Sequence, residues 1–284
     1  MTAEPTWLMA FDRTTGAELW KAENSVLTAV SGAERERFSA LLETTKKQQA
    51  TLKEKQRALS RLKRSARKAR DSATSQRLVT EMETLKAEVT RLRDAVETTR
   101  HLRTESTVDI IGYASSTPVT DGKRIFAVFG NGVVSAFELS GKRLWSRWLR
   151  DSRKLKAPFP MHGHVEGHAA SPQLVDGVLV VGFGVLMGLD PSTGEIRWEA
   201  GTFRDYGTPA VFPGPGGDTV VTADGRRIRA RDGSVLKAGE PLTYYTSPVV
   251  TQGQVYVTGA TSDDAGRPKA RAAKLSKGSG TTPA

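Results

Sequence analysis

Residues 189–198 read LDPSTGEIRW, in which Leu and Asp precede a turn-forming run and a short segment that ends in Trp. The stretch LMAFDRTTGAELW at residues 8–20 repeats the same order, and SGKRLW at residues 140–145 repeats its second half. Turn residues of this kind between apolar runs predict two β-strands joined by a tight turn. The copies therefore indicate a repeated β-hairpin whose last strand carries a Trp, at Trp20, Trp145 and Trp198.

A second repeated signal is a proline that comes shortly before a short apolar strand. These prolines are Pro118, Pro172, Pro209 and Pro248, with gaps of 54, 37 and 39 residues. In the second unit, strands are expected at Val178–Val181 and Gly184–Asp190 with a Gly-bearing turn between them. Four short strands in a unit of about 40 residues are typical of a β-propeller blade. A four-stranded sheet cannot bury both faces alone, so the blades must stack, and the Trp side chains can wedge between them.

The segment from Ala33 to Glu105 has a different texture, with no Gly, no Pro and mostly helix-forming residues. The turn-forming run Asp71–Ser75 divides it into two halves, each with an apolar seam. In the second half the seam residues are spaced alternately by four and three, which is typical of the a/d seam of a coiled coil, and in the first half they recur every seven residues. We therefore predict an antiparallel α-helical coiled-coil hairpin. The seam positions are Phe38, Thr45, Leu52, Leu59 and Ala66, and then Leu78, Met82, Leu85, Val89, Leu92, Val96 and Thr99.

The predicted fold is thus mainly β, a β-propeller with about four blades present and an inserted helical hairpin. The predicted organisation is a partial blade at residues 1–23, the hairpin at 33–105, further blades at 106–276 and a disordered tail at 277–284. Two closures are open: the partial blades at the two ends pair into a four-bladed ring, or the blades belong to a ring of seven or eight.

Composition excludes several classes of function. The 284-residue chain has no Cys, which excludes disulfide scaffolds, thiolate zinc sites, iron–sulfur clusters and cysteine nucleophiles. It has no apolar run of about 18 residues, so we expect no transmembrane helix. Residues 1–11 have neither a basic nor an apolar leader region, so we expect no signal peptide in this sequence. The formal net charge is +11, and residues 33–105, with 19 basic and 11 acidic side chains, carry most of it.

The order Asp–x–x–Thr–Gly–x–x–x–Trp, at residues 190–198 and again at residues 12–20, resembles the PQQ-like β-propeller repeat. The resemblance covers the chain outside the helical segment. It implies either a quinoprotein dehydrogenase or a non-enzymatic scaffold of the BamB-like branch. The dehydrogenases of this family are longer, hold calcium with Glu, Asn and Asp, and many have a vicinal disulfide. This sequence has no Cys, and we find no such set of Glu, Asn and Asp in it. The resemblance therefore favours the scaffold, which implies neither catalytic residues nor a cofactor and a location in the periplasm or cell envelope. Because the rings of the family are large, we favour the larger ring.

The histidines suggest a metal site. Three of the chain's four His residues, His162, His164 and His168, lie in the insertion between residues 146 and 167 or directly after it. A His-x-His pair on an extended strand places both rings on one side, and a third His can complete a three-ligand site. The alternative is a polar loop at the channel mouth. This insertion and the hairpin both follow a Trp-bearing strand, so we expect them to share one loop face.

A basic run ends the first predicted helix. One interpretation is a surface for an anionic partner, and the other is a solvated helix end where cations are favoured. The run contains no aromatic side chain to stack on bases, so nucleic acid is not expected. The residues are Arg57, Arg61, Lys63, Arg64, Arg67, Lys68 and Arg70.

We therefore expect a non-enzymatic protein-interaction scaffold that docks other proteins through the loop face with the hairpin and the His-rich loop. An anionic membrane surface is the other partner considered. The alternative function is a fragment of a quinoprotein (PQQ-dependent) or metal-dependent oxidoreductase.

Overall fold

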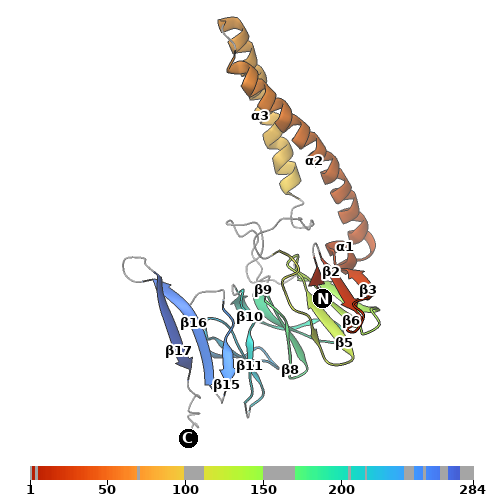
Figure 1. The fold of residues 1–284 in the computed structure, drawn as a ribbon, viewed down its shortest axis with the longest axis vertical. Coiled ribbons are helices and arrows are strands. Elements are labelled where there is room, and N and C mark those ends of the chain that lie inside the picture. Colours follow the sequence, from red (N-terminus) through yellow and green to blue (C-terminus); the bar gives the residue numbers. More distant parts are fainter. Residues whose placement is uncertain are drawn as a thin grey trace. The chain divides into compact units, whose positions relative to one another are not determined.

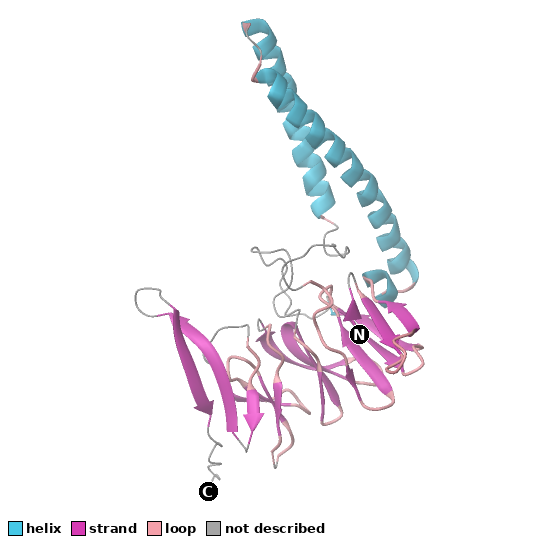
Figure 2. Cartoon of the chain, in the orientation of Figure 1, coloured by secondary structure: helices cyan, strands magenta, loops and turns pink. Residues whose placement is uncertain are grey.

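The computed structural model of the chain consists of two compact units (Figures 1 and 2). One unit is Met1–Val30 with Thr104–Ala284 and is built of β-sheets, and the other is Ser31–Arg103 and is helical. The structure describes residues 2–3, 6–68, 71–98, 112–149, 170–203, 206–214, 216–239, 246–251, 254–262 and 268–275. The predicted tail at 277–284 lies outside these residues.

The β-unit contains five antiparallel sheets, each formed by strands that follow one another in the chain. We call them sheets A to E. Sheet A has β1 (Thr2–Ala3), β2 (Trp7–Phe11) and β3 (Glu18–Glu23), and sheet B has β4 (Val119–Thr120), β5 (Arg124–Val128), β6 (Val133–Glu138) and β7 (Arg143–Trp148). Sheet C has β8 (Gln173–Val175), β9 (Val178–Leu189) and β10 (Ile196–Phe203), and sheet D has β11 (Ala210–Phe212), β12 (Thr219–Val221), β13 (Arg227–Arg229) and β14 (Val235–Lys237). Sheet E has β15 (Val249–Thr251), β16 (Gln254–Ser262) and β17 (Pro268–Leu275).

The middle strands are buried because they are covered on both faces. Every residue of β9 is buried, and in β6 the first five of six residues are. Continuous apolar runs, rather than an apolar–polar alternation, are the sequence pattern of strands with two covered faces. Sheets B and C therefore pack between neighbours instead of exposing one face to water.

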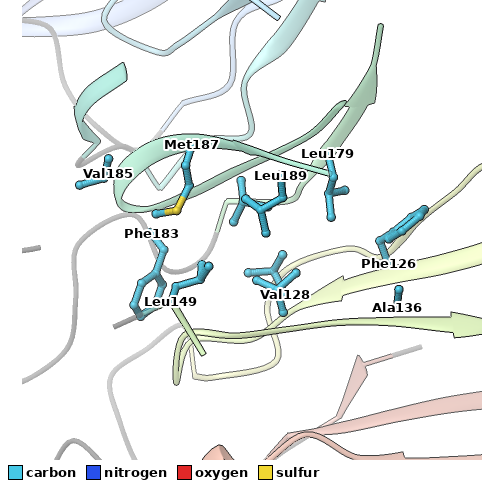
Figure 3. Close-up of a cluster of buried hydrophobic side chains, with 11 residues drawn as sticks. Phe126, Val128, Ala136, Leu149, Leu179, Phe183, Val185, Met187 and Leu189 are labelled. Carbon is cyan, nitrogen blue, oxygen red and sulfur yellow. The ribbon is translucent and has the colours of Figure 1, made fainter. Parts of the chain in front are cut away.

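Apolar clusters join each sheet to the next one in the chain, and Figure 3 shows the one between sheets B and C. In the part of the chain that the structure describes, the series of sheets is not closed into a ring. Stacking of this kind buries a continuous core although no single sheet could. Representative pairs are Leu8 with Phe137 for A and B, Val128 with Met187 for B and C, Phe203 with Ile228 for C and D, and Val221 with Val255 for D and E.

Two strands differ from the sequence prediction. Residues 178–189 form one continuous strand, β9, where two strands and a turn were expected. Gly184 within it has a φ of 66°, and Figure 3 shows the ribbon curving back near Val185. In sheet E, β16 extends to Ser262 and pairs with β17, a strand that the sequence analysis did not predict.

The helical unit consists of α2 (Gly32–Ala66) and α3 (Ser72–Glu97), which pack against each other in opposite directions (Figure 1). Asp71 caps α3, since its carboxylate accepts the Thr74 backbone N–H at 2.7 Å. Lys55 on α2 pairs with Glu88 on α3 at 2.7 Å. The buried residues of the two helices all fall on the predicted seams: Phe38, Thr45, Val89 and Val96. The short α1 (Val26–Ala29) belongs to the β-unit.

Candidate functional site

Each of the three repeated Trp side chains reaches into the next sheet. The indole Nε1–H of Trp145 in β7 donates to the carbonyl oxygen of Pro191 in sheet C at 3.0 Å. Trp20 in β3 donates to Leu139 of sheet B at 3.0 Å. Trp198 in β10 donates to Ala230 of sheet D at 2.9 Å. A buried indole usually finds such a partner, so these bonds fix how neighbouring sheets meet.

The ring of each of these indoles packs against the backbone of a turn glycine in the next sheet. We call the combination of this glycine and the nearby acceptor carbonyl a tryptophan dock. A Cβ atom placed on Gly141 would lie 2.6 Å from Trp20, one on Gly194 2.6 Å from Trp145, and one on Gly233 2.7 Å from Trp198. All three glycines have a φ between 74° and 88°, where L-residues are strained. Glycine is thus required at each dock for two reasons: the backbone has a positive φ, and a Cβ atom would collide with the indole ring.

The cross-strand neighbour of each docked Trp is also small. Trp20 lies opposite Ala10, Trp145 opposite Ala136, and Trp198 opposite Gly188. In sheet D the equivalent position, four residues after Gly233, is Lys237, and it lies opposite Arg227. Docked indoles therefore connect sheet A to B, B to C and C to D, and sheet D has no Trp at the equivalent position.

The four prolines that recur in the sequence immediately precede the first strands of sheets B to E: Pro118, Pro172, Pro209 and Pro248. The residue before each proline carries a hydroxyl group, and these residues are hydrogen-bonded from sheet to sheet. The backbone N–H of Thr117 donates to Oγ of Ser171 at 2.8 Å, and that of Ser171 to Oγ1 of Thr208 at 3.1 Å. The N–H of Thr208 donates to Oγ of Ser247 at 2.9 Å.

Sequence reasoning missed this second inter-sheet contact. Its signal is the recurring pair of Ser or Thr with Pro at residues 117–118, 171–172, 208–209 and 247–248. A proline has no N–H, and it holds the preceding residue in an extended conformation. The preceding residue is thus free to use its own N–H and hydroxyl across the sheet boundary.

The helical unit carries a groove of about 400 Å³ between α2 and α3. Ala58, Leu62 and Leu85 give it apolar walls, and Glu54, Arg61 and Glu81 give it charged rims. Arg61 therefore belongs both to the groove and to the predicted basic run. The groove lies toward the end of α2 at which Asp71 begins the second helix.

The basic run is exposed where the structure describes it, which is everywhere except Arg70. Within those described residues, none of the six cations makes an ion pair with an acidic side chain: Arg57, Arg61, Lys63, Arg64, Arg67 and Lys68. By contrast, Lys46 and Lys55 on the same helix each pair with a Glu. The end of α2 therefore presents positive charge that the helical unit does not neutralise.

The predicted His cluster, His162, His164 and His168, lies outside the described residues. Among the residues that are described, no group of three or more His, Cys, Asp or Glu side chains could hold a metal ion. The metal site stays a prediction. No helix in the described parts of the chain is both long and apolar enough to cross a membrane.

Five consecutive antiparallel sheets, three of them with a Trp-bearing hairpin, define a protein of the PQQ-like repeat class. The sequence matches the family described as outer membrane protein assembly factor BamB over residues 4–282, so the chain belongs to that family. No curated protein matches the sequence significantly.

Two solved structures are similar to the chain. BamB from Moraxella catarrhalis is 16% identical, with 57% of this chain and 50% of that chain covered and a TM-score of 0.39. A quinohemoprotein alcohol dehydrogenase, ADHIIG from Pseudomonas putida HK5, is 15% identical, with 52% of this chain and 21% of that chain covered and a TM-score of 0.27. The match thus spans half the length of the first structure and about a fifth of the second.

Proposed function

We propose that the chain is a non-enzymatic protein-interaction scaffold of the cell envelope. In this proposal sheets A to E are propeller blades that hold a coiled-coil hairpin of α2 and α3, and the hairpin binds a partner protein. The family description, which names outer membrane assembly, supports a place in the envelope. Function on an insertion carried by a rigid scaffold is a common arrangement.

The observation that carries this proposal is the unneutralised positive end of α2 beside the groove. Six exposed cations without acidic partners lie on α2, and one of them, Arg61, lines a groove whose walls are partly apolar. An acidic protein segment with apolar side chains would satisfy both features, because it neutralises the charge and covers Leu62 and Leu85. Charge complementarity of this kind accelerates association and makes it sensitive to salt.

Photo-crosslinking in intact cells tests this proposal. A photoreactive amino acid replaces Ala58 in the groove, and a second variant carries it at Lys142, an exposed position of the β-unit. We expect a discrete protein adduct from position 58 that is lost when Arg57, Arg61 and Arg64 are all changed to Gln. The matched control changes Lys86, Arg91 and Arg93 on α3 to Gln and should leave the adduct intact. An adduct that survives the first triple variant, or none at position 58, would overturn the proposal.

An anionic membrane is the competing partner for the same charges. Sedimentation with vesicles of phosphatidylcholine and phosphatidylglycerol distinguishes the two. We expect no binding at physiological salt, because exposed charges are screened beyond a Debye length of about 8 Å. Strong binding that the Arg57, Arg61 and Arg64 variant abolishes would instead identify a membrane-surface protein.

The enzymatic alternative has its own test. Equilibrium dialysis of the purified chain with PQQ and calcium measures quinone binding directly. We expect no saturable binding under any calcium concentration tested. Saturable, calcium-dependent binding would overturn the non-enzymatic proposal.

A further inference from the structure

The seam between α2 and α3 is poorly buried in the part of the hairpin that carries the groove. We call residues 46–68 and 71–88 the distal part of the hairpin. No described side chain in the distal part is fully buried, and its apolar seam residues, such as Leu52 and Leu59, are only partly buried. The distal part therefore keeps apolar surface that a further element can cover. The buried residues of the two helices all lie outside it, toward the start of α2 and the end of α3: Phe38, Thr45, Val89 and Val96.

The groove in the distal part has the spacing of a helix-packing surface. On α2 the lining residues Glu54, Ala58 and Leu62 follow one another by four positions, and on α3 Glu81 and Leu85 do the same. Rows of side chains four residues apart form the ridges and grooves in which helices pack. Ala58 has the smallest side chain of the lining, and it lies midway along the α2 stretch. A neighbouring backbone can therefore approach α2 closely at that point.

The backbone of the two helices offers no hydrogen-bond partner to an occupant of the groove. Residues 54–62 and 81–85 lie inside α2 and α3, where N–H and C=O groups bond to each other four residues along the helix. An extended segment in the groove would leave its own N–H and C=O groups without partners on the protein side. A helix satisfies these groups internally. The groove is therefore suited to a helix rather than to a strand.

Charged residues at the rims of the groove restrict the sequence of the occupant. Glu54, Arg61 and Glu81 form no ion pair with any described residue, whereas Lys55 in the same lining pairs with Glu88 at 2.7 Å. Glu54 and Arg61 are seven residues apart on α2, which is about two helical turns. An occupant with an acidic side chain against Arg61 and a basic one about two turns away, against Glu54, would complement both charges.

We propose that the occupant of the groove is an amphipathic α-helix of the partner protein, which packs on α2 and α3 as a third helix. This inference rests on the proposed function, in which a partner protein binds the hairpin. The helix presents apolar side chains, spaced by three and four residues, to Ala58, Leu62 and Leu85. It places an acidic side chain against Arg61 and a basic one against Glu54. Residues 54–62 span about 12 Å, so the contact covers two to three turns of the occupant.

Crosslinks from three positions of α2 test whether the occupant is helical. Thr51, Ala58 and Ser65 are seven residues apart, so they lie on one face of the helix at intervals of about 10 Å. A photoreactive amino acid replaces each in turn in the full chain in intact cells, and mass spectrometry identifies the partner residue that each position captures. A helical occupant should be captured at residues about seven apart, because it rises by about 1.5 Å per residue. An extended occupant rises by about 3.3 Å per residue and should be captured at residues about three apart.

The outcomes separate this inference from the proposed function. A spacing of about seven residues supports the third helix. A spacing of about three overturns it but leaves a partner protein bound at the groove. If position 58 gives no adduct, the proposed function fails and the third helix fails with it. An adduct between two copies of this chain would overturn the partner helix in favour of a second copy.

The captured segment, made as a peptide, gives a second readout with the purified full chain. A short isolated helix is marginally stable in water, so binding should increase the helical signal in far-ultraviolet circular dichroism. Proline at the centre of the peptide should weaken binding by about tenfold or more, and proline at its first helical position, the matched control, should not. Binding without a gain in helicity, or binding that the central proline leaves unchanged, would overturn the proposal.

The charge match is tested with the same peptide. Arg61→Glu in the full chain should weaken binding by about tenfold or more, because an acidic side chain then faces the acidic residue of the occupant. Arg57→Glu makes the same change of net charge on α2 at an exposed residue that does not line the groove, and it should weaken binding much less. Equal effects of the two variants would show that Arg61 does not contact the occupant and would overturn the proposed placement of the helix.

Discussion

The indole N–H of Trp145 lies 3.0 Å from the carbonyl oxygen of Pro191, 46 residues further along the chain and in a different sheet. The same ring rests on the backbone of Gly194 and packs against the apolar cluster between sheets B and C. One side chain thus supplies both a directional bond and apolar contact at the sheet boundary. The arrangement recurs at Trp20 and Trp198, so the same kind of contact joins sheet A to B, B to C and C to D.

Replacing Trp145 separates these two contributions. Trp145→Phe keeps an aromatic ring but loses the bond to Pro191, and we expect a loss of about 1–2 kcal/mol in the free energy of unfolding. Trp145→Ala also loses the ring, and we expect about 2–4 kcal/mol because the side chain is half-buried rather than fully buried. Urea unfolding followed by circular dichroism measures both. An Ala variant as stable as the Phe variant would mean that the ring does not hold the sheets together.

The glycine beneath the ring gives a second prediction. Gly194→Ala strains the backbone and also places a methyl group 2.6 Å from Trp145, whereas Gly177→Ala, at φ 67° with open space, meets only the strain. The backbone cost is about 1–2 kcal/mol for both. We expect Gly194→Ala to cost a further 1–3 kcal/mol or so, because overpacking displaces the indole. Thermal unfolding of the two variants gives the difference, and equal Tm values would contradict a close ring–glycine contact.

The hydrogen bonds between the residues that precede the prolines are tested at Thr208. Thr208→Val keeps the shape of the side chain but leaves the N–H of Ser171 without its acceptor, at a cost of about 1–3 kcal/mol. Hydrogen exchange measured residue by residue should show faster exchange at Ser171. Thr251→Val, at an exposed position of β15, is the control and should leave that exchange rate unchanged. Unaltered exchange in Thr208→Val would remove this bond from the inter-sheet contacts.

The strands and the docking Trp residues could be predicted because their signals are local. A turn run such as Asp190–Gly194 and the Trp that follows it occupy nine residues of sequence. The helices were equally accessible, and the buried residues Phe38 and Val89 lie on the predicted seams. In each case the pattern needs only the geometry of one strand or one helix.

The remaining features depend on contacts between distant segments. The hydrogen bonds from Thr117 to Ser171 and from Ser171 to Thr208 span 54 and 37 residues. No local sequence pattern predicts which residue donates and which accepts such a bond. The turns at Gly16 and Gly194 have the same sequence signature, and only the structure shows that Trp145 packs on Gly194 whereas no described residue comes within 4 Å of a Cβ atom placed on Gly16. The basic run of α2 was visible in the sequence, but only the structure of the two packed helices shows that its six described residues form no ion pair with an acidic side chain.

Asp121, in the turn between β4 and β5, gives a prediction for acid stability. Burial opposes its ionisation, but the backbone N–H groups of Arg124 and Lys123 and the Arg124 guanidinium outweigh this and hold its pKa at about 2, below the ordinary value of 3.8. A carboxyl group whose pKa is lower in the folded state stabilises the fold above the unfolded pKa, and this stabilisation is lost as pH falls. The window for Asp121 is therefore between about pH 5 and pH 2.

Asp121→Asn isolates this contribution, since the amide oxygen can still accept the two N–H groups while the charge is removed. The wild-type chain should be more stable than the variant at pH 6, because only the carboxylate pairs with Arg124 at 2.8 Å. The gap in Tm should then narrow steadily as pH falls from 5 toward 2, as the wild-type carboxyl takes up its proton. Thermal unfolding at half-unit pH steps measures the gap. A gap that is constant over this range, or that widens toward low pH, would show that the charge of Asp121 is not what stabilises the turn.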